Sequence, residues 1–129
     1  MPGRSSILER MATKPVLVVD DNPDTRDAIS RLLQIRGYPV ATAEDGWKAL
    51  QYLLDGGDAS LIILDLNMPR FDGRHFRAAQ LRNAELASIP VIVFTVAVGE
   101  TLPDVASVVR KSDPGALLGS IERALAMAG

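Results

Sequence analysis

Polar side chains follow four apolar runs of the sequence, at the point where each run ends. The runs are 16–19, 61–64, 91–94 and 108–109, and the polar residues are Asp20 and Asp21, Asp65, Thr95 and Lys111. Continuous apolar runs are typical of strands that are buried on both faces of a parallel sheet. Because ligands bind outside the carboxyl ends of the strands in such sheets, we expect these polar groups to converge on one edge.

This combination of side chains would support phosphoryl transfer. Three clustered carboxylates repel one another, and Mg²⁺ relieves the repulsion by binding one or two carboxylates together with phosphate oxygens. Lys111 would neutralise a phosphoryl group, and Thr95 would donate a hydrogen bond to it. Since carboxylates form aspartyl-phosphate intermediates, Asp65 is the expected phosphoryl acceptor.

Segments with helical patterns separate these runs and a fifth run at 40–43. Helix starts are predicted at Asn22-Pro23, near Asp72-Gly73, and where Ser112 or Asp113 precedes Pro114. The residues expected to face the core from the helices are Ala28, Leu32, Ile35, Trp47, Leu50, Leu54, Phe76, Ala79, Leu118, Ile121 and Leu125. The alternation of strands and helices predicts an α/β fold with a doubly wound, five-stranded parallel sheet.

The connection between the last two runs is too short for a regular crossover. Little more than 99–104 separates them, whereas a parallel crossover usually takes a dozen or more residues. Gly99 and Pro103 also disfavour a helix interior. We therefore expect the fourth crossover helix to be shortened or missing, and Leu102 and Val105 to fill the core.

Composition limits the classes of function. The chain has 129 residues, a net charge of −2 and no cysteine, so thiolate zinc sites and thiol nucleophiles are excluded. No apolar stretch approaches the 18 or so residues of a membrane span, and the balanced charge gives no field that would attract nucleic acid. His75, the single histidine, is expected to be an exposed helical residue. We expect 1–13 to be a tail or a short extra helix and 14–129 to be one domain.

The sequence resembles the receiver domain of two-component response regulators over residues 14–127. The resemblance rests on Val-Val-Asp-Asp at 18–21, Leu-Asp-Leu-Asn-Met-Pro at 64–69 with Asp-Gly at 72–73, Ile-Pro-Val-Ile-Val-Phe-Thr at 89–95, and Lys111. It implies a flavodoxin-like sheet with the strand order 2-1-3-4-5.

The resemblance also implies a role for each polar residue. The residues that would bind Mg²⁺ are Asp20 (through water), Asp21, Asp65 and Asn67 (through its carbonyl), and those that would hold the phosphoryl oxygens are Thr95 and Lys111. Asp65 would be phosphorylated from a sensor histidine kinase or a histidine phosphotransfer protein. The chain would then be a cytoplasmic, single-domain signalling switch, not a multiple-turnover enzyme, and would act on a protein target or as a homodimer.

Four features depart from the usual receiver pattern. Ser112 follows Lys111 where receivers usually have proline with a cis peptide, and Val108 stands where they usually have an aromatic switch residue. Val96 is bulkier than the small residue that usually follows the threonine, and the fourth crossover is short. All four lie on the face that receivers commonly use to signal, so we expect intact chemistry with an altered readout.

Other interpretations remain open from the sequence. The segment 20–23 alone could be an ordinary helix start, where acids and asparagine gather. A phosphatase of the haloacid-dehalogenase type would need a second acid where Asn67 stands. A pseudo-receiver that serves as a constitutive binding module, or the receiver portion of a hybrid kinase, is compatible with the departures. The basic residues Arg70, Arg74, Arg77 and Arg82 are interpreted as a solvated face.

Overall fold

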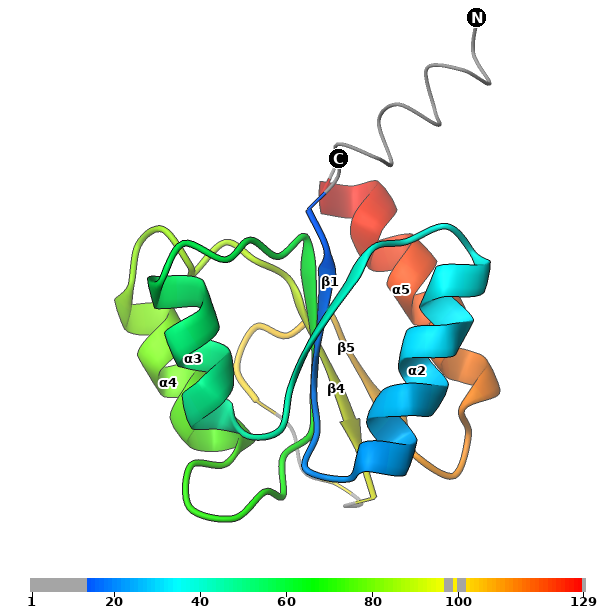
Figure 1. Ribbon diagram of the computed structural model, residues 1–129, viewed down its shortest axis with the longest axis horizontal. Helices are drawn as coiled ribbons and strands as arrows, with labels where there is room; N and C mark the ends of the chain where they lie inside the picture. The colour runs from blue at the N-terminus through cyan, green and yellow to red at the C-terminus, as the bar shows by residue number, and fades with distance from the viewer. Residues whose placement is uncertain (1–13, 97–98, 100–101, 129) are drawn as a thin grey trace, which may run out of the picture.

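Five parallel strands form the centre of the molecule, in the order β2-β1-β3-β4-β5 (Figure 1). The computed structural model describes residues 14–96, 99 and 102–128, so the predicted tail or extra helix at 1–13 lies outside the described residues. The strands are β1 (Val16–Val19), β2 (Val40–Ala43), β3 (Leu61–Leu64), β4 (Val91–Thr95) and β5 (Ser107–Arg110). The helices are α2 (Pro23–Ile35), α3 (Gly46–Leu54), α4 (Gly73–Arg82) and α5 (Gly115–Ala128). The predicted fold class and strand order are confirmed.

Helices cover both faces of the sheet, which explains the continuous apolar runs. Figure 1 shows α3 and α4 on one face and α2 and α5 on the other. In β1, Leu17 and Val19 belong to the core on the α3/α4 side, and Val16 and Val18 belong to the core on the other side. Every residue of β1 is therefore buried, as expected for a strand with no solvent-facing side.

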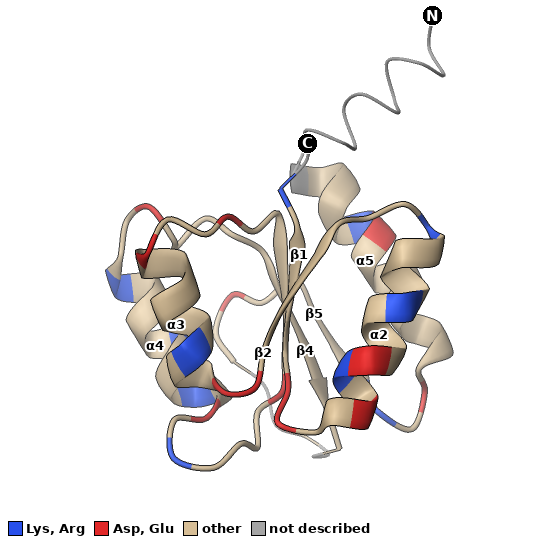
Figure 2. Cartoon of the chain, viewed as in Figure 1, with Lys and Arg blue, Asp and Glu red and all other residues tan. Residues whose placement is uncertain are grey.

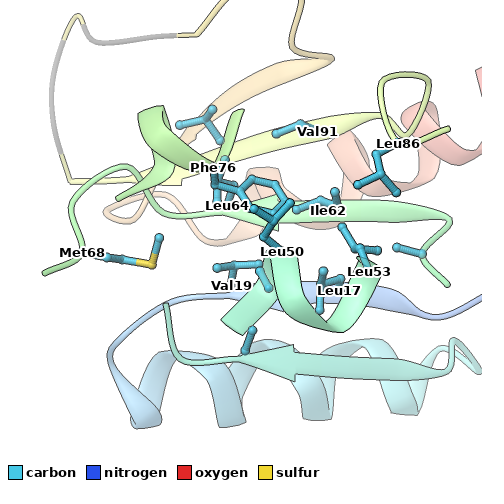
Figure 3. Packing of buried hydrophobic residues seen from close by; sticks show 14 of the residues in the cluster. Leu17, Val19, Leu50, Leu53, Ile62, Leu64, Met68, Phe76, Leu86 and Val91 are labelled. Carbon is cyan, nitrogen blue, oxygen red and sulfur yellow. The ribbon is translucent and has the colours of Figure 1, made fainter. Parts of the chain in front are cut away.

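The core on the α3/α4 side shows how the helices are attached to the sheet. Figure 3 shows Leu50 of α3 and Phe76 of α4 packed over Ile62 and Leu64 of β3. Phe76 and Leu64 are completely buried, and Met68 of the loop after β3 closes the end of this core near the carboxyl ends of the strands. This packing holds the loop that follows Asp65 against the sheet.

The predicted core face of α2 is wrong by one residue. Ile29 and Leu33 are the buried residues of this helix. Ala28 is exposed, Leu32 is half-buried, and Ile35 is 81% exposed. Because successive helical residues differ by about 100° around the axis, the two apolar stripes are neighbours and the sequence alone does not choose between them.

Two other helices also differ in part from the predicted faces. In α3, Leu50 is buried as predicted, but Trp47 and Leu54 are more than half exposed and Ala49 and Leu53 take their place. The most buried side chains of α5 are Leu117, Ile121 and Ala124, whereas Leu118 and Leu125 are half-buried. In α4, Phe76 is buried and Ala79 packs at the edge of the core, as predicted. No helix within the described part of the chain is long and apolar enough to cross a membrane.

The connection between β4 and β5 contains no helix among its described residues, 96, 99 and 102–106. Leu102 is buried and Val105 is half-buried, and both pack on the α3/α4-side core, which confirms their predicted use. Arg77 of α4, predicted to lie on a solvated face, is only 3% exposed. Its guanidinium donates to the backbone carbonyls of Pro103 and Asp104 in this connection.

Gly73, the first residue of α4, allows that helix to start directly against the end of β3. Its N–H donates to the carbonyl of Leu66 at 3.1 Å. A Cβ at this position would lie far inside van der Waals contact with the backbone carbonyl oxygen of Asp65 and within 2.9 Å of the Leu66 Cα. The helix start is therefore set by the absence of a side chain.

Substitution of Gly73 tests this close approach. We expect Gly73→Ala to lower the free energy of unfolding by about 1–3 kcal/mol, because backbone atoms must move to admit the methyl group. The measurement is urea denaturation followed by circular dichroism.

Gly119→Ala in α5 is the matched control. Its Cβ would meet only the flexible end of Arg123, at 3.2 Å, so the helix-forming preference of alanine should raise stability by about 0.5–1 kcal/mol. Equal stabilisation by both substitutions would show that Gly73 has no special packing role.

Candidate functional site

The carboxyl ends of β1 and β3 bring two buried aspartates side by side. These strands are parallel neighbours with Val19 opposite Leu64, so Asp20 and Asp65 follow at the same level. Asp20 is 2% exposed and Asp65 is 4% exposed, whereas Asp21 is open to solvent. One carboxylate oxygen from each of the three lies within 4.8 Å of the others. Figure 2 shows acidic residues (red) at this lower edge of the sheet, where β1 ends and α2 begins.

Lys111 reaches this acidic cluster from the far side of β4. Its Nζ lies 2.7 Å from Oδ2 of Asp20 and 3.3 Å from Oδ2 of Asp65. Its backbone N–H donates to the carbonyl of Thr95 at 2.9 Å, which fixes the residue directly after β5. The structure thus brings together four of the predicted site residues from three strand ends.

Burial and charge alter the proton affinity of the two groups at the centre of the site. Burial raises the pKa of the Asp65 carboxyl, the charge of Asp20 adds to this effect, and Lys111 only partly opposes it. Burial lowers the pKa of Lys111, but its hydrogen bond to Asp20 and the charges of both aspartates outweigh this, so its pKa lies above the ordinary value. Lys111 is therefore a cation held against the two buried acids.

Backbone donors orient the two buried carboxylates. Oδ1 of Asp20 accepts from the N–H of Asn22 at 2.9 Å, and Oδ1 of Asp65 accepts from the N–H of Asn67 at 3.3 Å. Asn22 is also the N-cap of α2, as its position before Pro23 predicts, and its side chain accepts from two N–H groups of the first turn. One turn at the start of α2 therefore orders both the helix and the acid that precedes it.

The two remaining predicted residues lie at the border of the cluster. Thr95 is fully buried at the end of β4, two residues beyond the partner of Leu64 in the sheet. Asn67 is exposed in the loop after β3. The structure therefore places Thr95 on the strand next to Asp65, and Asn67 two residues after Asp65.

Arg26 is a neighbour of the site that the sequence analysis missed. Its Nη1 donates to the backbone carbonyl of Asp20 at 2.7 Å. The only signal in the sequence is its place one turn into the helix that begins at Pro23, where a long side chain can reach back to the strand end.

The donor set fits a hard divalent cation. Three carboxylates with oxygens in one small volume are the ligands that Mg²⁺ takes, and the Coulombic repulsion between buried Asp20 and Asp65 is what a cation would relieve. Asp21 is exposed, so an ion would be approached from solvent and would keep water ligands.

The surroundings of the site show where this chain departs from the usual receiver pattern. Val96, directly after Thr95, is 69% exposed, and Val108 of β5 is 41% exposed. No cis peptide occurs among the described residues, so the Lys111–Ser112 bond is trans. His75 is exposed on α4, as predicted, and its Nδ1 accepts from the backbone N–H of Asp72 at 3.3 Å.

Solved structures with the same fold include two well-matched receivers. The chemotaxis protein CheY4 of Vibrio cholerae is 31% identical, with a TM-score of 0.76, over 88% of this chain and 99% of that one. The response regulator TrrA of Thermotoga maritima, in complex with Mg²⁺ and BeF, is 28% identical, with a TM-score of 0.77, over 88% of this chain and all of that one.

Curated relatives and a family match agree with these structures. The two-component response regulator ARR15 of Arabidopsis thaliana is 38% identical over an alignment 90 positions long, which covers 62% of this chain and 44% of that protein. The response regulator MprA of Mycobacterium sp. (strain KMS) is 38% identical over 80 residues, which are 62% of this chain and 34% of that protein. The chain thus spans less than half the length of these relatives. Residues 16–113 match the response regulator receiver domain family, and the chain belongs to this family.

Proposed function

We propose that this chain is a phosphorylation-controlled signalling switch in which Asp65 accepts the phosphoryl group. Membership of the receiver family supports phosphorylation-controlled signalling in general. The observation that supports the specific residue is the position of its buried carboxylate, 3.3 Å from the Lys111 ammonium and beside the carboxylates of Asp20 and Asp21. Asp20 is also buried and lies closer to Lys111, at 2.7 Å, so the choice of Asp65 over Asp20 rests on the receiver motif at 64–69.

The proposed donor is the phosphohistidine of a sensor histidine kinase or a histidine phosphotransfer protein. A carboxylate oxygen of Asp65 forms a bond to phosphorus, the phosphorus–nitrogen bond breaks, and its electron pair returns to the imidazole of the donor. The product adds negative charge beside two existing acids. Lys111 offsets this charge, and Thr95 donates a hydrogen bond to a phosphoryl oxygen. Water releases the group later by hydrolysis of the same acyl phosphate, so we expect no multiple turnover on a separate substrate.

Asp20, Asp21, Asp65 and the carbonyl of Asn67 are the proposed Mg²⁺ site. When bound, the ion supplies positive charge that offsets the repulsion between the acids and the incoming phosphoryl oxygens. Lys111 touches Asp20 and Asp65, so the cluster already contains one compensating cation. Three carboxylates carry more negative charge than one lysine can balance, and a divalent ion would offset the remainder.

The surface beside the site supports a protein partner. An apolar groove of about 320 Å³ lies between α2 and α5, and its lining includes Leu32, Phe94, Pro114 and Lys111. Ala28 and Leu32 of α2, which were predicted to face the core, line this groove. A donor protein that brings its histidine to Asp65 would cover this edge. The proposed reaction with such a donor would take place in the cytoplasm. We expect the output to be a contact with a protein target or a homodimer, with no nucleic acid bound by this domain.

A pseudo-receiver, used as a constitutive binding module, is the second candidate. The specific observations in its favour are that Val96 and Val108 are exposed and that the described residues of the β4–β5 connection, 96, 99 and 102–106, form no helix. This candidate predicts an intact fold with no phosphoryl transfer, so one experiment distinguishes the two.

Phosphorylation by acetyl phosphate and Mg²⁺ tests the proposed function. We expect intact-mass analysis to show the addition of one phosphoryl group to the wild type and none to Asp65→Asn, because the amide is not a nucleophile. Asp58→Asn, an exposed aspartate in the loop before β3, is the matched control and should be modified like the wild type. No adduct on the wild type, or an equal adduct on Asp65→Asn, would refute the assignment.

The raised pKa of Asp65 predicts how stability depends on pH. Because the folded-state pKa lies above the unfolded value, the contribution of this group to stability is fully present below the unfolded pKa, about 4. It is lost as the pH rises through the folded-state pKa. In EDTA at pH 7, Asp65→Asn should therefore have a higher Tm than the wild type, and the difference should shrink toward pH 4.

Scanning calorimetry across this pH range, with and without Mg²⁺, checks the prediction. Mg²⁺ should raise the Tm of the wild type and reduce its difference from the variant, since a ligand that binds the folded state stabilises it. A lower Tm for Asp65→Asn at pH 7 in EDTA would show that the ion pair with Lys111 outweighs the cost of burying this carboxylate.

A further inference from the structure

A buried arginine and a buried glutamine of α4 contact two loops that lie beside this helix. Arg77 is 3% exposed and Gln80 is fully buried. They are three residues apart, so they lie on one side of the helix, and Arg77 Nη1 donates to Oε1 of Gln80 at 2.8 Å. A cation and an amide thus occupy a position where apolar side chains normally pack.

These two side chains bind the backbone of two loops. Arg77 donates to the carbonyl of Pro103 from Nε at 3.2 Å and from Nη2 at 3.0 Å, and to the carbonyl of Asp104 from Nη2 at 3.0 Å. Gln80 Nε2 donates to the carbonyls of Leu86 and Ile89, each at 3.0 Å. The guanidinium therefore joins α4 to a segment 26 residues further along the chain.

The contacts of Arg77 have a defined geometry, and they cost free energy of folding. Burial lowers the pKa of Arg77, and the carboxylate of Asp104 only partly opposes this. The hydrogen-bond acceptors named above are all neutral, so the desolvation of the charge is only partly compensated. Asp104 itself has a φ of 55°, in the left-handed region that costs a residue with a Cβ about 1 kcal/mol. A contact with these costs is better explained by the position in which it holds residues 103–104 than by a contribution to the stability of the fold.

The contact joins a helix that starts against Asp65 to the segment that leads into β5. The start of α4 is fixed to the acceptor, because Gly73 packs against the Asp65 carbonyl and donates to Leu66. The β4–β5 connection begins after Thr95, whose carbonyl accepts from the N–H of Lys111. Arg77 therefore joins α4, which starts against Asp65, to residues 103–104, which lead into β5 and Lys111.

We propose that Arg77 is a positioning residue that holds the β4–β5 connection on α4 while Asp65 is unmodified, and releases it when a phosphoryl group draws Thr95 toward Asp65. This inference rests on the proposed function of Asp65. The buried guanidinium then couples the state of Asp65 to the position of the β4–β5 connection. Val108, an exposed aliphatic residue, is unsuited to this role. Because coupling between two sites is reciprocal, a contact that is lost on occupancy of Asp65 also opposes that occupancy.

Beryllofluoride with Mg²⁺, as a phosphoryl mimic, tests the inference in two readouts. In the wild type, amide hydrogen exchange in peptides covering 102–106 should become faster when beryllofluoride is bound. In Arg77→Met these amides should exchange fast already without it, and the affinity for beryllofluoride, measured by the fluorescence of Trp47, should rise roughly fivefold or more. A residue with a purely structural role would not tighten binding at Asp65.

Arg82→Met is the matched control, since it removes an exposed arginine from the same helix, and it should behave like the wild type. Arg77→Lys keeps the charge but loses the planar fork, and should give an intermediate result if Arg77→Met does not fold. Wild-type affinity in both Arg77 variants, with an unchanged exchange response at 102–106, would overturn the inference and leave the proposed function intact. Failure of the wild type itself to bind beryllofluoride would overturn both.

Discussion

The ionic contact of Lys111 with two buried aspartates is the constraint on which the rest of the structure depends. Asp20 and Asp65 are adjacent because parallel strands end at one level, and their mutual repulsion requires a cation. The lysine that supplies it comes from beyond β4, so β4, β5 and the start of α5 must be placed correctly for the contact to form. The doubly wound sheet achieves this with both of its faces covered, and its buried strands give a rigid base to the site.

Most of this arrangement could be predicted from the sequence. The apolar runs that form β1, β3 and β4 are continuous because these strands have no face toward solvent, and this pattern predicts a parallel sheet. Polar residues directly after such runs must then meet at one edge. This reasoning correctly placed Asp20, Asp21, Asp65 and Lys111 together, although each would be unremarkable alone. The chemical roles of all six site residues, Asn67 and Thr95 included, stay predictions, since they concern ligands of the site.

Other features could not be predicted, for physical reasons. Two apolar stripes run along α2, and only the packing of the complete sheet decides that Ile29 and Leu33 face inward while Ile35 is exposed. Arg77 resembles its exposed neighbours in charge and spacing. Its burial follows from contacts with residues 103 and 104, which lie 26 and 27 positions further along the chain, and such long-range contacts leave no local pattern in a sequence.

The most direct test of the central claim is a crystal structure of the protein with Mg²⁺ and beryllofluoride. The account predicts beryllium bonded to a carboxylate oxygen of Asp65, a magnesium ion held by the acidic cluster, and the Nζ of Lys111 moved from the aspartates to a fluoride. An unmodified Asp65, with Lys111 still bridging it to Asp20 under conditions where TrrA of Thermotoga maritima takes up both groups, would contradict the account.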